Sequence, residues 1–215
     1  MYKAIIFDLD GTLLDTSKDI CEILNKTIKK FSLPKILLEK TIEFVGDGAR
    51  KLVERAVGQK DQTFIEKVYR DFSKSYADCD NSLTCLYPDE SEVLQNFKNA
   101  GIKLAILTNK PQGATERVFA KFLANFGFNI VLGQTEYRPL KPNPASVFEI
   151  LKNFEVDKKD CLFVGDGETD IKTAKNAGLK CASVLWGFRS RKQLEEAGGD
   201  LFVSSFSELE QIVNF

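Results

Sequence analysis

The stretch Phe7–Asp15, FDLDGTLLD, decides the fold and raises the question of function. Its first residue, Phe7, is the last residue of a short apolar run, KAIIF, which is typical of a buried strand. Asp8 and Asp10 are two residues apart, so on an extended segment both side chains point the same way. Two carboxylates that close repel each other unless a positive charge lies between them. The stretch is therefore either a solvated turn or a cation site at a strand end.

Short apolar runs alternate with helical patterns along most of the chain. The further predicted strands are rich in Ile, Val, Leu and Phe and cover residues 102–108, 129–133, 160–166, 180–185 and 200–203. Between them apolar residues recur at helical spacing, and Gly101, Gly127 and Gly178 follow such segments, where a helix is expected to stop. Strands that alternate with helices predict an α/β fold, a doubly wound parallel sheet with helices on both faces.

Residues 16–82 break this alternation, because they show helical patterns and no convincing strand. The first predicted helix carries an apolar stripe that includes Ile20, Leu24 and Ile28, and Thr16 or Ser17 is expected to cap it. We therefore predict an α/β core formed by residues 1–15 and 83–215, and an inserted helical cap domain over residues 16–82. An insertion at this point lies over the carboxyl end of the first strand, where ligands of open α/β sheets bind.

Composition excludes several classes of function. The chain has 215 residues, a formal net charge of −1 and no histidine, which removes Ser-His-Asp chemistry and His-ligated metals. Its five cysteines form no CxxC pair, which argues against a disulfide framework and a thiolate zinc site. The sequence has no apolar run of membrane-spanning length, and we expect no secretory signal. We expect a cytoplasmic protein without nucleic-acid or membrane partners; the sequence does not give its oligomeric state.

Polar side chains follow the ends of other predicted strands. Thr108 and Asn109 follow one strand, Asp166 ends another, and Asp170 comes four residues later in a helix's first turn. Lys141 lies in a loop, RPLKPNP. Since the carboxyl ends of parallel strands meet at one edge, we expect these groups to gather around Asp8 and Asp10. Carboxylates without histidine suit a hard cation, so Mg²⁺ is the predicted cofactor.

This set suggests phosphoryl transfer. A carboxylate beside Mg²⁺ can attack phosphorus and form an aspartyl phosphate. Lys141 would neutralise the phosphoryl oxygens and Thr108 would hydrogen-bond one of them. Asp10 would then protonate the leaving oxygen and later take a proton from water. The substrate would be a small phosphorylated metabolite.

Four segments, DLDGTLLD, LTNK, KPNP and GDGETD, resemble in that order the signature motifs of the haloacid dehalogenase superfamily. The resemblance implies a Rossmann-like core with a helical cap. It implies Asp8 as nucleophile, Asp10 as acid and base, and Thr108 and Lys141 as phosphate binders. The metal ligands implied are Asp8, the Asp10 carbonyl and Asp166, with Asp170 nearby. Further substrate contacts are expected from Gly11, Thr12 and Asn109.

Within the superfamily, FVGDGARKLVERAV and VLWGF are similar to segments of phosphoglycolate phosphatases. The family often has Asn between the two cap glycines, where this chain has Asp47. Gly46, Gly48 and Arg50 are expected to close over the far end of the substrate. The resemblance thus favours 2-phosphoglycolate as the substrate. Pyrophosphate, phosphosugars and nucleotides fit the same core chemistry, and a non-catalytic nucleotide-binding module is the alternative from another class.

Overall fold

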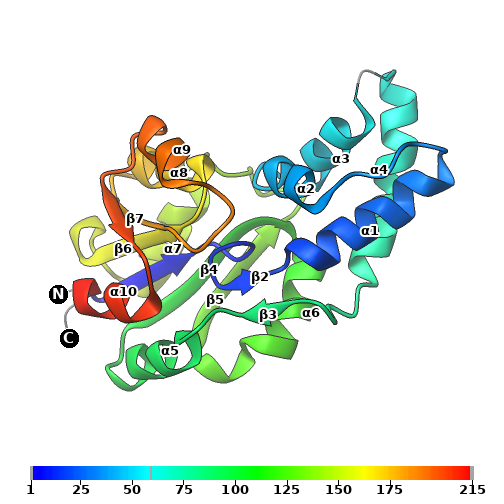
Figure 1. The fold of residues 1–215 in the computed structure, drawn as a ribbon. Helices are drawn as coiled ribbons and strands as arrows, with labels where there is room; N and C mark the ends of the chain where they lie inside the picture. The colour runs from blue at the N-terminus through cyan, green and yellow to red at the C-terminus, as the bar shows by residue number, and fades with distance from the viewer. Residues whose placement is uncertain (1, 59, 214–215) are drawn as a thin grey trace.

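The computed structural model describes residues 2–58 and 60–213, which form a central sheet with helices on both faces and a helical extension at one end (Figure 1). The sheet has six parallel strands in the order β5-β4-β1-β6-β7-β8. These strands are β1 (Ala4–Phe7), β4 (Lys103–Pro111), β5 (Phe128–Gln134), β6 (Cys161–Gly165), β7 (Lys180–Val184) and β8 (Leu201–Val203). All six strands predicted from the sequence are present, and the predicted α/β fold with a doubly wound parallel sheet is confirmed.

The two faces of the sheet bury separate hydrophobic cores, because successive side chains on a strand point to opposite faces. Ile5 and Phe7 of β1 belong to one core, and Ala4 and Ile6 belong to the other. The first core is covered by α5 (Glu90–Asn99), α6 (Gln112–Phe122) and α10 (Phe206–Val213). The second is covered by α7 (Ala145–Phe154), α8 (Glu168–Ala177) and α9 (Arg191–Glu196). Short 3₁₀ turns, η1 (Ala124–Phe126) and η2 (Lys158–Asp160), precede β5 and β6.

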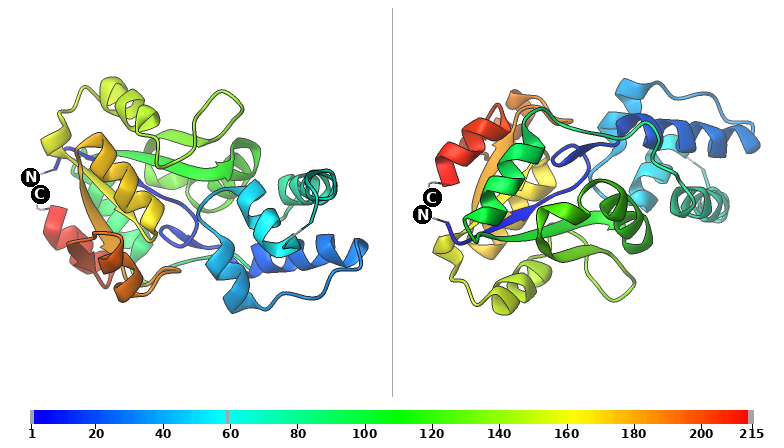
Figure 2. Two further views of the ribbon diagram at one scale, coloured as in Figure 1. Left: turned by 90° about the horizontal axis from the view of Figure 1, so that it is seen from above. Right: turned by 90° about the horizontal axis from the view of Figure 1, so that it is seen from below.

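The segment after β1 is helical and packs around a third hydrophobic core of its own. Its elements are α1 (Ser17–Lys30), α2 (Leu38–Phe44), α3 (Ala49–Val57) and α4 (Gln62–Ala77). In both views of Figure 2 these helices project to one side of the sheet. The short helix α2 was not anticipated, because it has seven residues, no side-chain cap and Thr41 as its buried residue. No helix among the described residues is long and apolar enough to cross a membrane.

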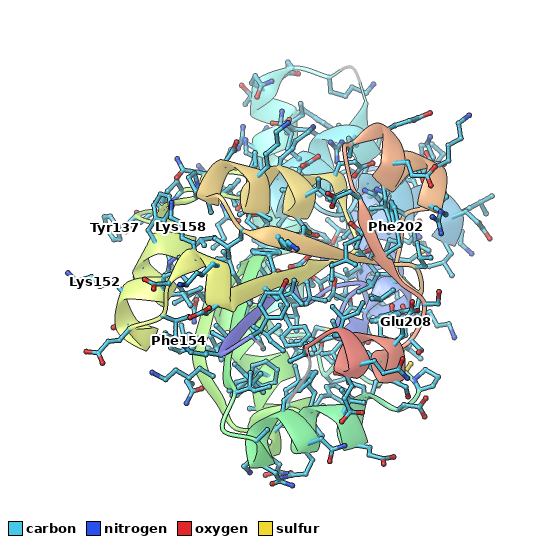
Figure 3. All side chains as sticks on the ribbon, turned by 90° about the vertical axis from the view of Figure 1, so that its left-hand side faces the viewer. Tyr137, Lys152, Phe154, Lys158, Phe202 and Glu208 are labelled. Carbon is cyan, nitrogen blue, oxygen red and sulfur yellow. The ribbon has the colours of Figure 1, made fainter. Side chains whose placement is uncertain are left out.

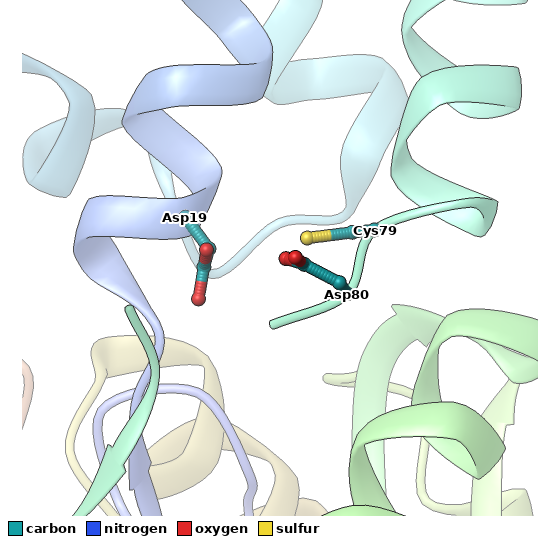
Figure 4. A group of neighbouring side chains, drawn as sticks. All are labelled: Asp19, Cys79 and Asp80. Atoms are coloured by element: carbon teal, nitrogen blue, oxygen red, sulfur yellow. The ribbon is translucent and has the colours of Figure 1, made fainter. Parts of the chain in front are cut away.

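The helical segment joins the core through two adjacent chain crossings. β2 (Leu14–Asp15) leads into α1 and pairs antiparallel with β3 (Cys85–Leu86), which leads back to the core. The buried Asp19 carboxylate of α1 ties the crossings together, since it accepts hydrogen bonds from Leu83 N and the Thr84 hydroxyl, the latter at 2.6 Å. Figure 4 shows Asp19 on α1 facing the segment that follows α4. This two-stranded ribbon was not predicted, because each strand has only two residues.

Candidate active site

Three buried carboxylates meet at the carboxyl edge of the sheet. Asp8 follows β1, Asp166 follows β6, and Asp170 lies in the first turn of α8. Their ligand atoms lie within 4.8 Å of one another, and all three residues are buried. Asp170 also caps its own helix, because one of its oxygens accepts the Gly167 N–H at 3.0 Å. The strand order explains the convergence, since β1 and β6 are neighbours.

A buried lysine lies within this acidic cluster. Lys141 Nζ is 2.8 Å from Asp8 Oδ1 and 2.7 Å from Asp170 Oδ1. Burial by itself would lower the pKa of Lys141, but Asp170 and Asp8 outweigh burial and hold that pKa above its ordinary value. Lys141 is therefore a fixed positive charge beside Asp8.

One lysine does not neutralise the cluster. Burial raises the pKa of Asp8 to about 7; Lys141 opposes this rise and Asp170 adds to it. Burial, together with repulsion from Asp170 and Asp8, raises the pKa of Asp166 to about 8. The raised pKa values mean that burial and mutual repulsion outweigh Lys141, so the ionised form of the cluster lacks sufficient positive charge beside it. The donor set and its deficit of positive charge fit a hard divalent cation such as Mg²⁺.

Gly11 and Thr12 build the surroundings of Asp166. The Thr12 hydroxyl donates to Asp166 Oδ1 at 3.2 Å, and Phe188 N donates to Oδ2 at 2.7 Å. Gly11 has φ +85°, and a Cβ there would lie 2.3 Å from Asp166 Oδ2. Gly187 approaches equally closely, because its Cβ would lie 2.3 Å from that of Asp166. Gly11 and Thr12 both lie against Asp166 and are not among the residues that line the cavity, and their predicted substrate contacts stay predictions.

The predicted residues at the end of β4 differ in what they contact. Thr108 lines the cavity, and its hydroxyl oxygen accepts the Lys110 N–H at 3.2 Å. The Asn109 amide donates to the carbonyls of Gly46 at 3.0 Å and Lys141 at 3.1 Å, and its oxygen accepts the Lys141 N–H at 2.8 Å. Asn109 lines the cavity and its amide joins the Lys141 loop to the helical segment; its contact with the substrate stays a prediction.

A cavity of about 60 Å³ lies between the sheet edge and the helical segment. On the side of the sheet edge the cavity is lined by Asp8, Asp10, Thr108 and Asp166. On the side of the helical segment it is lined by residues 45–49. By this measure one water needs roughly 10–15 Å³, so the cavity in this arrangement accommodates only a small solute.

Of the predicted cap residues, two reach the cavity and one does not. Gly46 and Gly48 line it, with φ values of +120° and +89° that favour glycine. Arg50 points elsewhere, because its guanidinium pairs with Glu66 at 2.5 Å and with Glu54 at 3.3 Å. Arg50 is not among the residues that line the cavity, and its contact with the substrate stays a prediction.

Sequence reasoning missed residues that join the helical segment to the core around the cavity. Arg189 donates to the backbone carbonyls of Ile42 at 2.9 Å and Val45 at 2.6 Å. The Thr169 hydroxyl of the core donates to the Asp47 carboxylate at 3.0 Å. Asp47, which stands where related phosphatases often have Asn, thus supplies a hydrogen-bond acceptor to the core. Arg189 follows the quoted VLWGF, but no local pattern predicts which backbone carbonyls a surface-loop arginine will meet.

Lys110 and Tyr76 were missed as well. Lys110 Nζ lies 2.9 Å from Asp10 Oδ1 and 2.5 Å from the Tyr76 hydroxyl, and both residues line the cavity. The signal for Lys110 was its position, since it comes two residues after Thr108 at the end of a predicted strand. Tyr76 continues the helical spacing of the α4 apolar stripe and could not be distinguished from a core residue.

Comparison with known proteins agrees with this arrangement. The family described as Haloacid dehalogenase-like hydrolase matches residues 5–184. A phosphoglycolate phosphatase of Vibrio parahaemolyticus is 31% identical, covering 98% of this chain and 96% of its own length. One from Aquifex aeolicus is 32% identical, with 86% of each chain covered. The crystal structure of a predicted phosphoglycolate phosphatase from Haemophilus somnus aligns with a TM-score of 0.91 and 28% identity, covering 99% of this chain and 98% of that one. The chain therefore belongs to the haloacid dehalogenase-like hydrolases, as an enzyme of the phosphatase type similar to phosphoglycolate phosphatases.

Proposed function

We propose that this protein is a Mg²⁺-dependent phosphomonoesterase that works through an aspartyl phosphate on Asp8. The observation that carries the proposal is the buried cluster of Asp8, Asp166 and Asp170, which line a small cavity, together with Lys141, which pairs with Asp8 and Asp170. The carboxylates of Asp8 and Asp166 and the Asp10 carbonyl would hold the ion, with Asp170 beside them. When bound, Mg²⁺ supplies positive charge to the phosphoryl oxygens and favours the ionised form of the cluster.

The chain's own residues then account for both chemical steps. An Asp8 carboxylate oxygen attacks phosphorus, the ester P–O bond breaks, and Asp10 gives a proton to the departing oxygen. Water next attacks the phosphorus of the aspartyl phosphate, Asp10 accepts the proton of that water, and the bond from Asp8 to phosphorus breaks. Free phosphate leaves, and both carboxyl groups return to their starting states. Lys141 and the Thr108 hydroxyl would hold phosphoryl oxygens throughout.

We propose 2-phosphoglycolate as the substrate. Support comes from the names of the curated relatives and from the cavity of about 60 Å³, which suits a small ester better than a nucleotide. Residues 16–82 would act as a cap that opens for substrate and closes over it, a gating role common in enzymes. The loop at Gly46 and Gly48 would contact the far end of the substrate. The cytoplasmic location predicted from the sequence belongs to the same proposal.

The test is a turnover screen with Mg²⁺ over small phosphate compounds, including 2-phosphoglycolate, pyrophosphate, a phosphosugar and a nucleotide. We expect 2-phosphoglycolate to have the highest kcat/KM, and Asp8→Asn to abolish turnover of every compound. If 2-phosphoglycolate were turned over poorly while other compounds were hydrolysed well, the substrate assignment would be overturned. Full activity of Asp8→Asn would overturn the mechanism and favour a nucleotide-binding module.

A further inference from the structure

Lys110 is a lysine whose burial needs an explanation. Its side chain is only 1% exposed. Removing an ammonium group from water costs several kcal/mol unless charged and polar partners replace the water. Two partners do so: Asp10 Oδ1 at 2.9 Å and the Tyr76 hydroxyl at 2.5 Å. The ammonium also lies 4.5 Å from the centre of the Tyr76 ring, within the range of a cation–π contact.

The Asp10 carboxylate is held by one of its oxygens only. Oδ1 accepts hydrogen bonds from Lys110 Nζ and from the Thr16 hydroxyl at 2.7 Å. Thr16 or Ser17 was expected to cap α1; Thr16 occupies the N-cap position, but its hydroxyl donates to Asp10 and makes no capping bond to the helix. Among the described residues none donates to Oδ2, and Asp10 lines the cavity. Two donors on one oxygen fix the carboxyl plane and leave the other oxygen available for proton transfer.

The second partner of Lys110, Tyr76, comes from the helical segment. Tyr76 lies on α4, whereas Asp10 and Lys110 follow β1 and belong to the end of β4. Its hydroxyl oxygen accepts from Lys110, and its ring is 6% exposed. Lys110 therefore has its full set of partners only while α4 occupies this position over the core. The contact links the orientation of Asp10 to the placement of the cap.

We propose that Lys110, with Tyr76, is a positioning residue that orients Asp10 for proton transfer when the cap is closed. This inference rests on the role of Asp10 in the proposed function and deepens it. As the ester P–O bond breaks, its electron pair moves to the leaving oxygen and that oxygen takes the proton from Asp10. Lys110 keeps all its protons and exchanges none with substrate. Its contribution is the geometry of Asp10, so in the step that forms the aspartyl phosphate its loss matters only when the leaving group needs a proton.

The test compares two small substrates that differ in this need. Glycolate leaves 2-phosphoglycolate as an alkoxide and requires a proton, whereas acetate leaves acetyl phosphate as a stable anion. We expect Lys110→Met, which removes the charge but retains the length, to lower the single-turnover rate constant for glycolate release from 2-phosphoglycolate about 100-fold, in the range of a lost general acid. The single-turnover rate constant for acetate release from acetyl phosphate should fall less than about threefold, and KM for both substrates should change little.

Two further variants keep the test decisive. Tyr76→Phe removes only the hydroxyl and should show the same selective loss at a smaller size, so it serves if Lys110→Met unfolds. Lys152→Met is the matched control, because Lys152 is exposed on α7 and points away from the molecule in Figure 3; both rates should stay unchanged. Equal losses with both substrates, or an effect on KM alone, would overturn the proposal.

Failure of this inference is distinguishable from failure of the proposed function. If Asp10→Asn abolishes 2-phosphoglycolate turnover while Lys110→Met does not alter it, Asp10 keeps its role and the positioning proposal is wrong. If Asp8→Asn still hydrolyses acetyl phosphate at the wild-type rate, the proposed function itself is wrong.

Discussion

Replacing Glu90 with Gln should stabilise the protein near neutral pH. Glu90 begins α5, is fully buried, and accepts the Tyr87 N–H at 3.0 Å through one oxygen. Its other oxygen has no hydrogen-bond partner among the described residues. Burial raises the pKa of the Glu90 carboxyl from 4.5 to about 9, although the Tyr87 N–H opposes the rise. The folded protein therefore holds a neutral carboxylic acid at neutral pH, and Gln has nearly the same shape.

The pKa fixes the sign and size of the effect. Between pH 4.5 and about 9 the folded state keeps the proton and the unfolded state has lost it, so the free energy of unfolding falls as pH rises. Each pH unit in this window costs about 1.4 kcal/mol, which amounts to about 3 kcal/mol at about pH 7. Glu90→Gln removes this cost, because an amide does not ionise. The two proteins should be equally stable near pH 4.5 and diverge above it.

The assay is urea unfolding of wild type and Glu90→Gln at several pH values, with the difference in unfolding free energy plotted against pH. Other titrating groups are common to both proteins and cancel in that difference. Glu92→Gln is the matched control, since Glu92 is exposed on the same helix and should give a flat, near-zero line. A flat difference for Glu90→Gln, or a variant less stable than wild type at about pH 8, would refute the reasoning.

Three other substitutions test the cation cluster, the crossings and the cap contacts. Asp166→Asn should weaken Mg²⁺ binding more than about tenfold in calorimetric titration, because it removes a charged ligand; unchanged affinity would exclude Asp166 as a ligand. Asp19→Ala leaves the Leu83 N–H and the Thr84 hydroxyl without their acceptor, so urea unfolding should show a loss of about 2–3 kcal/mol, and no loss would contradict this. Arg189→Met removes the donors to the cap carbonyls, so KM for 2-phosphoglycolate should rise about tenfold or more in steady-state kinetics; an unchanged KM would show that these bonds do not hold the cap.

The sheet was predictable because its strands are nearly continuous apolar runs separated by helical patterns. Local sequence carries both signals, as in Ala4–Phe7 and Cys161–Gly165. The ribbon of Leu14–Asp15 with Cys85–Leu86 could not be predicted, since its partners are distant in sequence and too short for a pattern. The strand at Lys103–Pro111 also runs past its predicted end at Thr108, through a register shift against β5.

The convergence of the carboxylates was predictable from one rule, that parallel strands end at the same edge of a sheet. Asp8 and Asp166 needed only that rule and their positions at strand ends. That rule could not predict the contacts of Lys110, Tyr76 and Arg189, because they depend on where the helical segment lies over the core. That placement follows from three-dimensional packing and has no signature in one stretch of sequence.

The central claim, that Asp8 is phosphorylated during turnover, can be tested by trapping. Asp10→Asn should still react with acetyl phosphate that carries radioactive phosphorus, in the presence of Mg²⁺, since acetate leaves without a proton. It should then hydrolyse the labelled intermediate slowly, because it lacks the base. After acid quench and digestion, the account predicts label on the peptide that contains Asp8, released by hydroxylamine, and none in the double variant Asp8→Asn, Asp10→Asn. Label that persists in the double variant, or that lies on another peptide, would contradict it.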